Sequence, residues 1–228
     1  GCLDDDGDGW DNANDALPNL ATQWLDQDND GYGDNASGLQ PDACPGVAGT
    51  STADRYGCVD SDGDGVSNLT DAFPNDPTRS GDMDNDGFDN AEDRCPNVAG
   101  NSTVDRLGCV DSDGDGVSDP DATVPNGTNW TVANGADAFP NDPTQTNDSD
   151  MDGFGNNISG FQGDACPTTS GTSNQDRFGC LDGDGDGHSD LNDAFLSEST
   201  QWADADADGF GDNPNGTQPH ACPSTPGP

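Results

Sequence analysis

One aspartate motif recurs along this sequence and has the spacing of a metal-binding loop. The string Asp-x-Asp-x-Asp-Gly begins at eight positions, Asp4, Asp26, Asp60, Asp82, Asp111, Asp148, Asp182 and Asp204. Aspartates at positions 1, 3 and 5 place three carboxylates around one point, and glycine at position 6 permits the sharp turn. Position 7 offers a backbone carbonyl, and positions 9 and 12 complete a shell of oxygen ligands. This chemistry suits calcium better than magnesium, which demands tight octahedral geometry.

Four loops carry a candidate ligand at every side-chain position. These are Asp4, Asp6, Asp8, Asn12 and Asp15; Asp60, Asp62, Asp64, Asn68 and Asp71; Asp82, Asp84, Asp86, Asn90 and Asp93; and Asp182, Asp184, Asp186, Asp190 and Asp193. In three others an aspartate beyond an insertion aligns with the missing last ligand. These are Asp26, Asp28, Asp30, Asp34 and Asp42; Asp111, Asp113, Asp115, Asp119 and Asp137; and Asp148, Asp150, Asp152, Asn156 and Asp164.

The last loop departs from this plan. It offers Asp204, Asp206, Asp208 and Asp212, but His220 stands where an aspartate is expected. A hard cation gains little from an imidazole, so we expect this site to be the weakest. The loops together predict about eight calcium ions, two in each of four repeats.

The composition indicates that these loops, rather than an apolar core, must hold the chain together. Leu, Ile, Val and Phe account for 28 of 228 residues, and no segment has helical periodicity. All but two of the 46 acidic residues are aspartate, whose short side chain suits turns and compact ligand cages. Prolines within residues 71–77 and 137–143 exclude the flanking helices of an EF-hand.

The cysteines predict a disulfide framework. Three Cys-Pro cysteines each precede a Gly-Cys cysteine by 14 residues, which gives the pairs Cys44–Cys58, Cys95–Cys109 and Cys166–Cys180. The closely spaced cysteine pairs of a zinc site are missing. Disulfides predict an oxidising, extracellular setting. Cys2 and Cys222 are left over, so either the array continues beyond this segment or these two bond between chains.

Four repeats follow from the regular order of loops and cysteines. They span residues 1–56, 57–107, 108–178 and 179–228, with an insertion at about 120–136 and a truncated C-terminal end. We predict an irregular fold with few regular secondary-structure elements, an elongated array of calcium-coordinating loops cross-linked by disulfides. The chain has no initiator Met and no signal peptide, so we interpret it as a mature chain or a fragment of one.

Glycosylation sequons exceed the number that chance predicts. The expected sites are Asn35, Asn101, Asn126, Asn129, Asn147, Asn157 and Asn215. Asn68 also lies in a sequon, but it holds a calcium-loop position, so we expect it to be the least modified. These sites predict covalent N-glycans on a secreted protein.

Charge and side-chain chemistry exclude several classes of function. A net charge of −41 with five arginines and no lysine argues against binding nucleic acid or anionic membranes, and no apolar run is long enough to span a bilayer. No nucleophile–base pair is present, and the paired aspartates fit ligands better than acid–base catalysts, so we expect no enzymatic activity.

The tryptophans could form a platform that binds sugars, but they fit better as apolar contacts that pin neighbouring loops together. Arg55, Arg106 and Arg177 each follow an aspartate and stand three residues ahead of a Gly-Cys cysteine. We expect each to form a local ion pair that braces the loop between repeats rather than to bind a substrate.

The segment GCVDSDGDGVSNLTDAFPNDPT followed by DMDNDGFDNAEDRCP resembles thrombospondin type 3 repeats, especially the prokaryotic-style arrays. The resemblance covers the whole chain. It implies a calcium-stabilised, disulfide-linked wire with little regular structure and two ions per repeat, which serves adhesion, spacing or matrix roles.

The leading interpretation is a secreted calcium-binding structural or adhesive protein. It would form a calcium-rigidified rod in an extracellular fibre or matrix, through self-association or contact with other matrix or cell-surface proteins. The alternatives are a calcium-dependent binding module similar to a dockerin, which would need helices and an apolar docking face, or a spacer attached to an enzyme outside this segment.

Overall fold

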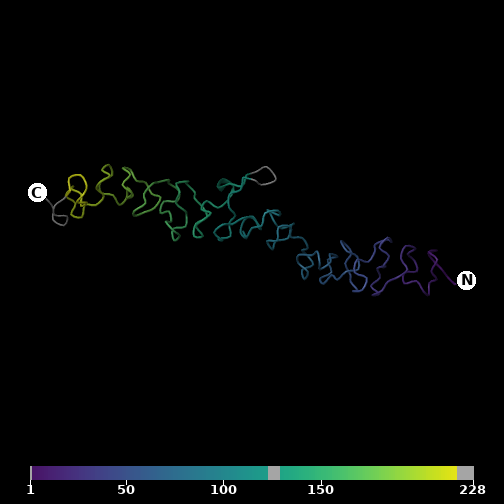
Figure 1. Cartoon of the computed structure of the whole chain (residues 1–228). Helices are drawn as coiled ribbons and strands as arrows, with labels where there is room; N and C mark the ends of the chain where they lie inside the picture. Colours follow the sequence, from purple (N-terminus) through teal and green to yellow (C-terminus); the bar gives the residue numbers. More distant parts are fainter. Residues whose placement is uncertain (1, 123–128, 220–228) are drawn as a thin grey trace. The chain divides into compact units, whose positions relative to one another are not determined.

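The computed structural model describes residues 2–122 and 129–219, and turns and loops make up nearly all of them. Figure 1 shows the chain as a trace of loops. In the described ranges the only regular elements are a 3-10 turn, η1 (Val132–Asn134), and an isolated antiparallel bridge between Asp121 and Trp130. The prediction of an irregular fold is therefore confirmed. None of the helical structure in these ranges has the length and apolar character that a membrane span requires.

The chain contacts divide it into two compact units, Gly1–Asn97 and Val98–Pro228. Both units are built from the same kinds of loop. The four predicted repeats are a finer division of the sequence and stay a prediction.

The interior of each unit is polar. Among the described residues, the buried apolar side chains are Ala136 and three cysteines, whereas the fully or nearly fully buried polar ones are aspartates, serines and glutamines. Large apolar side chains lie outside instead, and those of Leu69 and Leu191 are 75 % and 74 % exposed. Hydrophobic burial therefore contributes little to this fold, and hydrogen bonds, disulfides and the acidic loops must supply its cohesion.

The predicted disulfides are present. Cys44 is bonded to Cys58 and Cys166 to Cys180, each pair with its Cα atoms 5.1 Å apart. The cysteines of the other predicted pair, Cys95 and Cys109, are disulfide-bonded as well. Cys2 is exposed and is not part of a disulfide among the described residues, and Cys222 lies outside them.

A buried serine organises each of two disulfide loops. Ser51 is fully buried, its Oγ donates to the carbonyl of Arg55, and it accepts the N–H of Cys58 at 3.0 Å. Ser173 makes the same two bonds in the later loop. Each bridge is thus fixed by internal hydrogen bonds as well as by its sulfur atoms.

Arg55 and Arg177 form no ion pair among the described residues. Arg55 donates to the carbonyl of Ala43 and the Sγ of Cys44. The Asp54 carboxylate is bound instead by Ser67, through its N–H at 2.9 Å and its hydroxyl at 2.7 Å, and by the Thr70 hydroxyl. Although partial burial opposes it, these hydrogen bonds lower the pKa of Asp54. The aspartate therefore ties the disulfide loop to the next acidic loop. The ion-pair prediction was wrong for Arg55 and Arg177.

Aromatic side chains pack in pairs between loops. The rings of Trp10 and Trp24 stack with centroids 6.4 Å apart, and His188 stacks on Trp202 at 4.8 Å. These contacts agree with the interpretation of the tryptophans as pins between neighbouring loops.

Three repeats carry a five-residue insertion just before the last ligand position, at residues 37–41, 159–163 and 215–219. A buried glutamine binds the backbone at each of these insertions, and the sequence analysis missed it. Gln23 is 0 % exposed, its Nε2 donates to the carbonyls of Asn35 and Leu39, and its Oε1 accepts the Asn35 N–H at 2.9 Å. Gln145 and Gln201 make the matching bonds in the third and fourth repeats. The second repeat lacks the insertion and has Arg79 where the other repeats have the glutamine. This joint occurrence of glutamine and insertion is the sequence signal that could have revealed the contact.

The Gln23→Ala variant should lose about 2–4 kcal/mol of unfolding free energy, because it removes three buried hydrogen bonds and leaves a cavity. Hydrogen exchange at the Asn35 amide should accelerate accordingly. Arg79→Ala at the aligned, partly exposed position is the control and should cost about 1 kcal/mol or less. Equal costs at the two positions would contradict the assigned role of the glutamine.

Candidate metal centres

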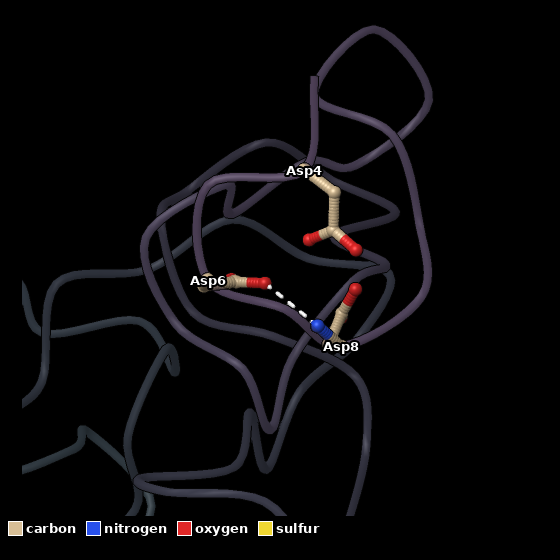
Figure 2. A group of neighbouring side chains, drawn as sticks. All are labelled: Asp4, Asp6 and Asp8. Carbon is tan, nitrogen blue, oxygen red and sulfur yellow. Dashed lines mark hydrogen bonds between the residues drawn. The ribbon is translucent and has the colours of Figure 1, made fainter. Parts of the chain in front are cut away.

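The aspartates of each motif converge on a common point. In Figure 2 the carboxylates of Asp4, Asp6 and Asp8 turn toward the same space inside one loop. Candidate ligand atoms in each such group lie within 4.8 Å of one another, and three further groups among the described residues meet the same criterion. Five of these groups are Asp4, Asp6 and Asp8; Asp26, Asp28 and Asp30; Asp60, Asp62 and Asp64; Asp82, Asp84 and Asp86; and Asp111, Asp113 and Asp115.

Backbone amides within the loop hold carboxylates in place. In the loop that begins at Asp60, the two oxygens of this residue accept the N–H groups of Gly63 and Gly65 at 2.8 and 2.9 Å. Asp62 and Asp64 each accept, through Oδ1, the N–H of the residue two positions further on. Both glycines have a positive φ, +84° and +98°, which glycine adopts without steric cost. The turn therefore aims the carboxylates inward.

Many of the other carboxylate oxygens are buried without a hydrogen-bond donor. Examples are Oδ2 of Asp62 and both oxygens of Asp28, Asp84 and Asp150. Burying an anionic oxygen without a partner is costly, and a bound cation removes that cost. Several such oxygens around one point fit a hard divalent cation, so these aspartates could hold one metal ion in each loop.

The last ligand position is filled in the loops with an insertion as well. Asp42, Asp137 and Asp164 are 6 %, 0 % and 1 % exposed, and each accepts through Oδ1 the N–H of the residue two positions later. Oδ2 of each is buried without a donor. Asp30, Asp28 and Asp34 act electrostatically on Asp42. Asp115, Asp113 and Asp119 act in the same way on Asp137, and Asp152, Asp150 and Asp148 act on Asp164. Each distant aspartate therefore joins its predicted cluster.

Crowding of carboxylates shifts their titration. Burial raises the pKa of Asp137 to about 6 against the hydrogen bond from Phe139, and the negative charges of Asp115 and Asp113 raise it further. Burial likewise raises the pKa of the last-position carboxyls Asp42, Asp93, Asp164 and Asp193. Without a cation these clusters are electrostatically unfavourable at neutral pH.

At position 9 the asparagines close the loop. Asn68 Oδ1 accepts the N–H of Ser61 at 2.8 Å, and its Nδ2 donates to the Ser61 hydroxyl. The same oxygen of Asn12, Asn90 and Asn156 accepts the N–H of the residue at position 2. The acids at this position close the loop in the same way. Asp119 accepts the N–H and the hydroxyl of Ser112, Asp190 accepts the N–H of Gly183, and Asp34 accepts the N–H of Gln27. Oδ1 of Asp34 is buried without a donor.

The Gly-Cys glycine closes the second site of a repeat, a contact that the sequence analysis missed. Gly57 has φ +74°, and a Cβ there would lie 2.4 Å from Asp42 Oδ1 and 3.0 Å from Asp30 Oδ2. The N–H of Gly49 also donates to Asp30 Oδ2 at 2.9 Å. Gly179 occupies the same place against Asp164 and Asp152. The disulfide loop therefore forms one wall of this acidic cluster.

The last loop keeps its first aspartate in place, since Asp204 Oδ2 accepts the N–H of Gly209 at 2.9 Å. Asp212 accepts the N–H of Ala205 through one oxygen, and its other oxygen is buried without a donor. His220 lies outside the described residues.

The predicted glycosylation sites differ in exposure. Asn101, Asn129, Asn147, Asn157 and Asn215 are exposed, and Asn35 is half-buried. Nδ2 of Asn35 donates to the carbonyl of Thr22 at 2.8 Å. Asn126 lies outside the described residues.

No protein-family model matches the chain, and no curated protein sequence is significantly similar to it. The resemblance to thrombospondin type 3 repeats therefore rests on the motifs alone and stays a prediction.

The Gly179→Ala variant should weaken cation binding at the neighbouring cluster. Its Cβ would lie 2.3 Å from Asp164 Oδ1, and alanine at φ +72° is strained. Gly185→Ala is the matched control, because its φ of +81° is similar but nothing lies within 4 Å of its Cβ. Calcium titration should show one weakened site in Gly179→Ala beyond any effect of Gly185→Ala, and equal effects would contradict the proposed wall.

Acidification should act in opposite directions on the cation-free and cation-loaded chain. Since the pKa of Asp137 is raised to about 6 from 3.8, the folded state binds the extra proton between about pH 4 and 6. In the cation-free chain this group therefore adds stability as the pH falls from 7 to 5. In the loaded chain the same protons compete with the ion, so calcium affinity should fall over that range. Affinity that is unchanged between pH 7 and 5 would contradict this account.

Proposed function

We propose that this chain is a secreted calcium-binding structural or adhesive repeat protein, of the kind that the thrombospondin type 3 resemblance implies. The observation that carries the proposal is the recurrence of buried, donor-free aspartate oxygens around one point in loop after loop. These clusters stand where an ordinary domain would have its apolar core. In this proposal the bound ions stiffen the chain into a rod.

Calcium is the ion that the ligand chemistry favours. The candidate shells are made of carboxylate oxygens and, in four loops, an asparagine amide oxygen. A backbone carbonyl is available at position 7, and no cysteine or histidine is among the predicted ligands. Such a shell is hard, and its loops can offer more oxygens than the octahedron that magnesium requires. The proposed content is about eight ions per chain, one for each motif.

An extracellular location supports the same function. Disulfides persist where the environment is oxidising. Extracellular modules can also use weak calcium sites, with dissociation constants of about 10⁻⁴–10⁻³ M. There the rod would space or connect matrix or cell-surface proteins, with N-glycans on its exposed asparagines. No catalytic step is part of this proposal, because the acidic pairs serve as ligands.

The dockerin-like alternative receives less support. A dockerin presents helices to its partner, and the described residues contain only the three-residue turn η1. A spacer for an enzyme outside this segment would use the same rigid rod, so it differs from the main proposal in its neighbours rather than in its mechanism.

Calcium binding should be counted directly. Equilibrium dialysis of the disulfide-intact chain at about 0.15 M salt should give about eight bound calcium ions, because each motif forms one site. Magnesium at the same concentration should displace few of them. A matched triple variant, Asp60→Asn with Asp62→Asn and Asp64→Asn, should bind about one ion fewer. Binding of only one or two ions, or preference for magnesium, would contradict the proposal.

A further inference from the structure

An open pocket of about 680 Å³ lies in the third repeat. Its lining includes Phe139, Asp142, Phe154 and Phe161. Phe161 is 67 % exposed and belongs to the five-residue insertion at residues 159–163. Asp142 Oδ1 accepts the N–H and the hydroxyl of Thr144, and no described residue donates to its Oδ2. The pocket thus combines aromatic surface with a carboxylate oxygen that has capacity for a further donor.

In the second repeat an aromatic ring, a carboxylate and a backbone carbonyl form a similar framework, and a side chain of the protein itself occupies it. The guanidinium carbon of Arg79 lies 4.0 Å from the centroid of the Phe73 ring. Nε of Arg79 donates to Asp76 Oδ2 at 2.9 Å, and Nη1 donates to the carbonyl of Gly87 at 3.5 Å. Thr78 donates to Asp76 Oδ1, so the arginine uses the other carboxylate oxygen.

The groups that hold this arginine recur in the pocket, but the arginine does not. Counting along the two repeats, the counterparts of Phe73, Asp76 and Gly87 are Phe139, Asp142 and Gly153, and all three line the pocket. The counterpart of Arg79 is Gln145, which is 1 % exposed and donates to the carbonyls of Asn157 and Phe161. Because this glutamine is bound to the insertion, the framework for a guanidinium stays open.

We propose that the pocket binds the guanidinium of an arginine side chain from a basic partner protein. The face of Phe139 would take the planar cation, and Asp142 Oδ2 would accept a charge-assisted hydrogen bond. Arginine fits better than lysine because its flat, forked donor group matches both an aromatic face and a carboxylate. The net charge of −41 also attracts a basic partner and opposes docking of a second copy through its exposed Arg94.

The first repeat shows that the framework is not general. Leu17 and Leu20 stand at the positions of Phe139 and Asp142, so neither the aromatic face nor the acid is present there. The site is therefore a property of particular repeats and does not follow from the acidic loops, on which the proposed calcium function rests.

The test is a titration of the calcium-loaded full chain, labelled with ¹⁵N, at about 0.15 M salt to screen nonspecific attraction. The probes are acetyl-Gly-Arg-Gly-amide and its lysine counterpart. The arginine peptide should produce saturable shifts at the Asp142, Gly153 and Phe154 amides, and the lysine peptide weaker ones. Asp142→Asn should weaken arginine binding about tenfold, because it removes the charged acceptor. Glu92→Gln, which removes an exposed charge elsewhere, should change nothing.

A second variant tests the comparison with the second repeat from which the proposal is argued. Arg79→Ala empties the framework of the second repeat, so the arginine peptide should now also shift the Gly87 amide. Equal binding of the two peptides, or equal binding by wild type and Asp142→Asn, would overturn the proposal. Self-association that is lost in Arg94→Ala would identify a second copy as the occupant and overturn the choice of a partner protein.

Discussion

The rest of this structure depends on one constraint: carboxylate oxygens converge in each acidic loop, and many of them have no hydrogen-bond donor within reach. The clusters around Asp28, Asp84 and Asp150 bury negative charge in an interior that has almost no apolar side chains. Such an arrangement is electrostatically unfavourable at neutral pH, and the proposed cations would neutralise it. A site occupied at about 100 times its dissociation constant adds about 2.7 kcal/mol, so a series of sites can replace the contribution that a hydrophobic core makes elsewhere.

Covalent and hydrogen-bonded connections carry order from one cluster to the next. Gly57 lies against the acidic cluster that contains Asp42, and its neighbour Cys58 forms the disulfide with Cys44. Asp54, in the same loop, binds Ser67 within the following acidic loop. The Cys44–Cys58 loop thus contacts one cluster through a glycine and the next through an aspartate. The Cys166–Cys180 loop does the same through Gly179 and Asp176. This coupling fits loops that become more rigid when the neighbouring sites fill.

Spacing within the sequence was enough to predict the acidic clusters and the disulfides. The internal alignment also found Asp42, Asp137 and Asp164, because each repeat serves as a template for the others. It did not find the buried Gln23, since a glutamine is usually a surface residue and only its hydrogen bonds reveal this role. The arginine ion pairs were predicted from adjacency in sequence, whereas Asp54 finds its partners 13 and 16 residues away. Long-range partners of this kind are set by loop packing, which spacing does not encode.

The most direct test of the central claim is hydrogen exchange measured by mass spectrometry, with disulfides intact, in calcium and after chelation. If the ions form the core, amides inside the acidic loops, such as those of Gly63 and Gly65, should lose protection on chelation and regain it when calcium returns. Amides within the disulfide loops, such as that of Cys58, should lose less. Protection that is indifferent to calcium would contradict the account and would leave the disulfides and hydrogen bonds as the sole source of order.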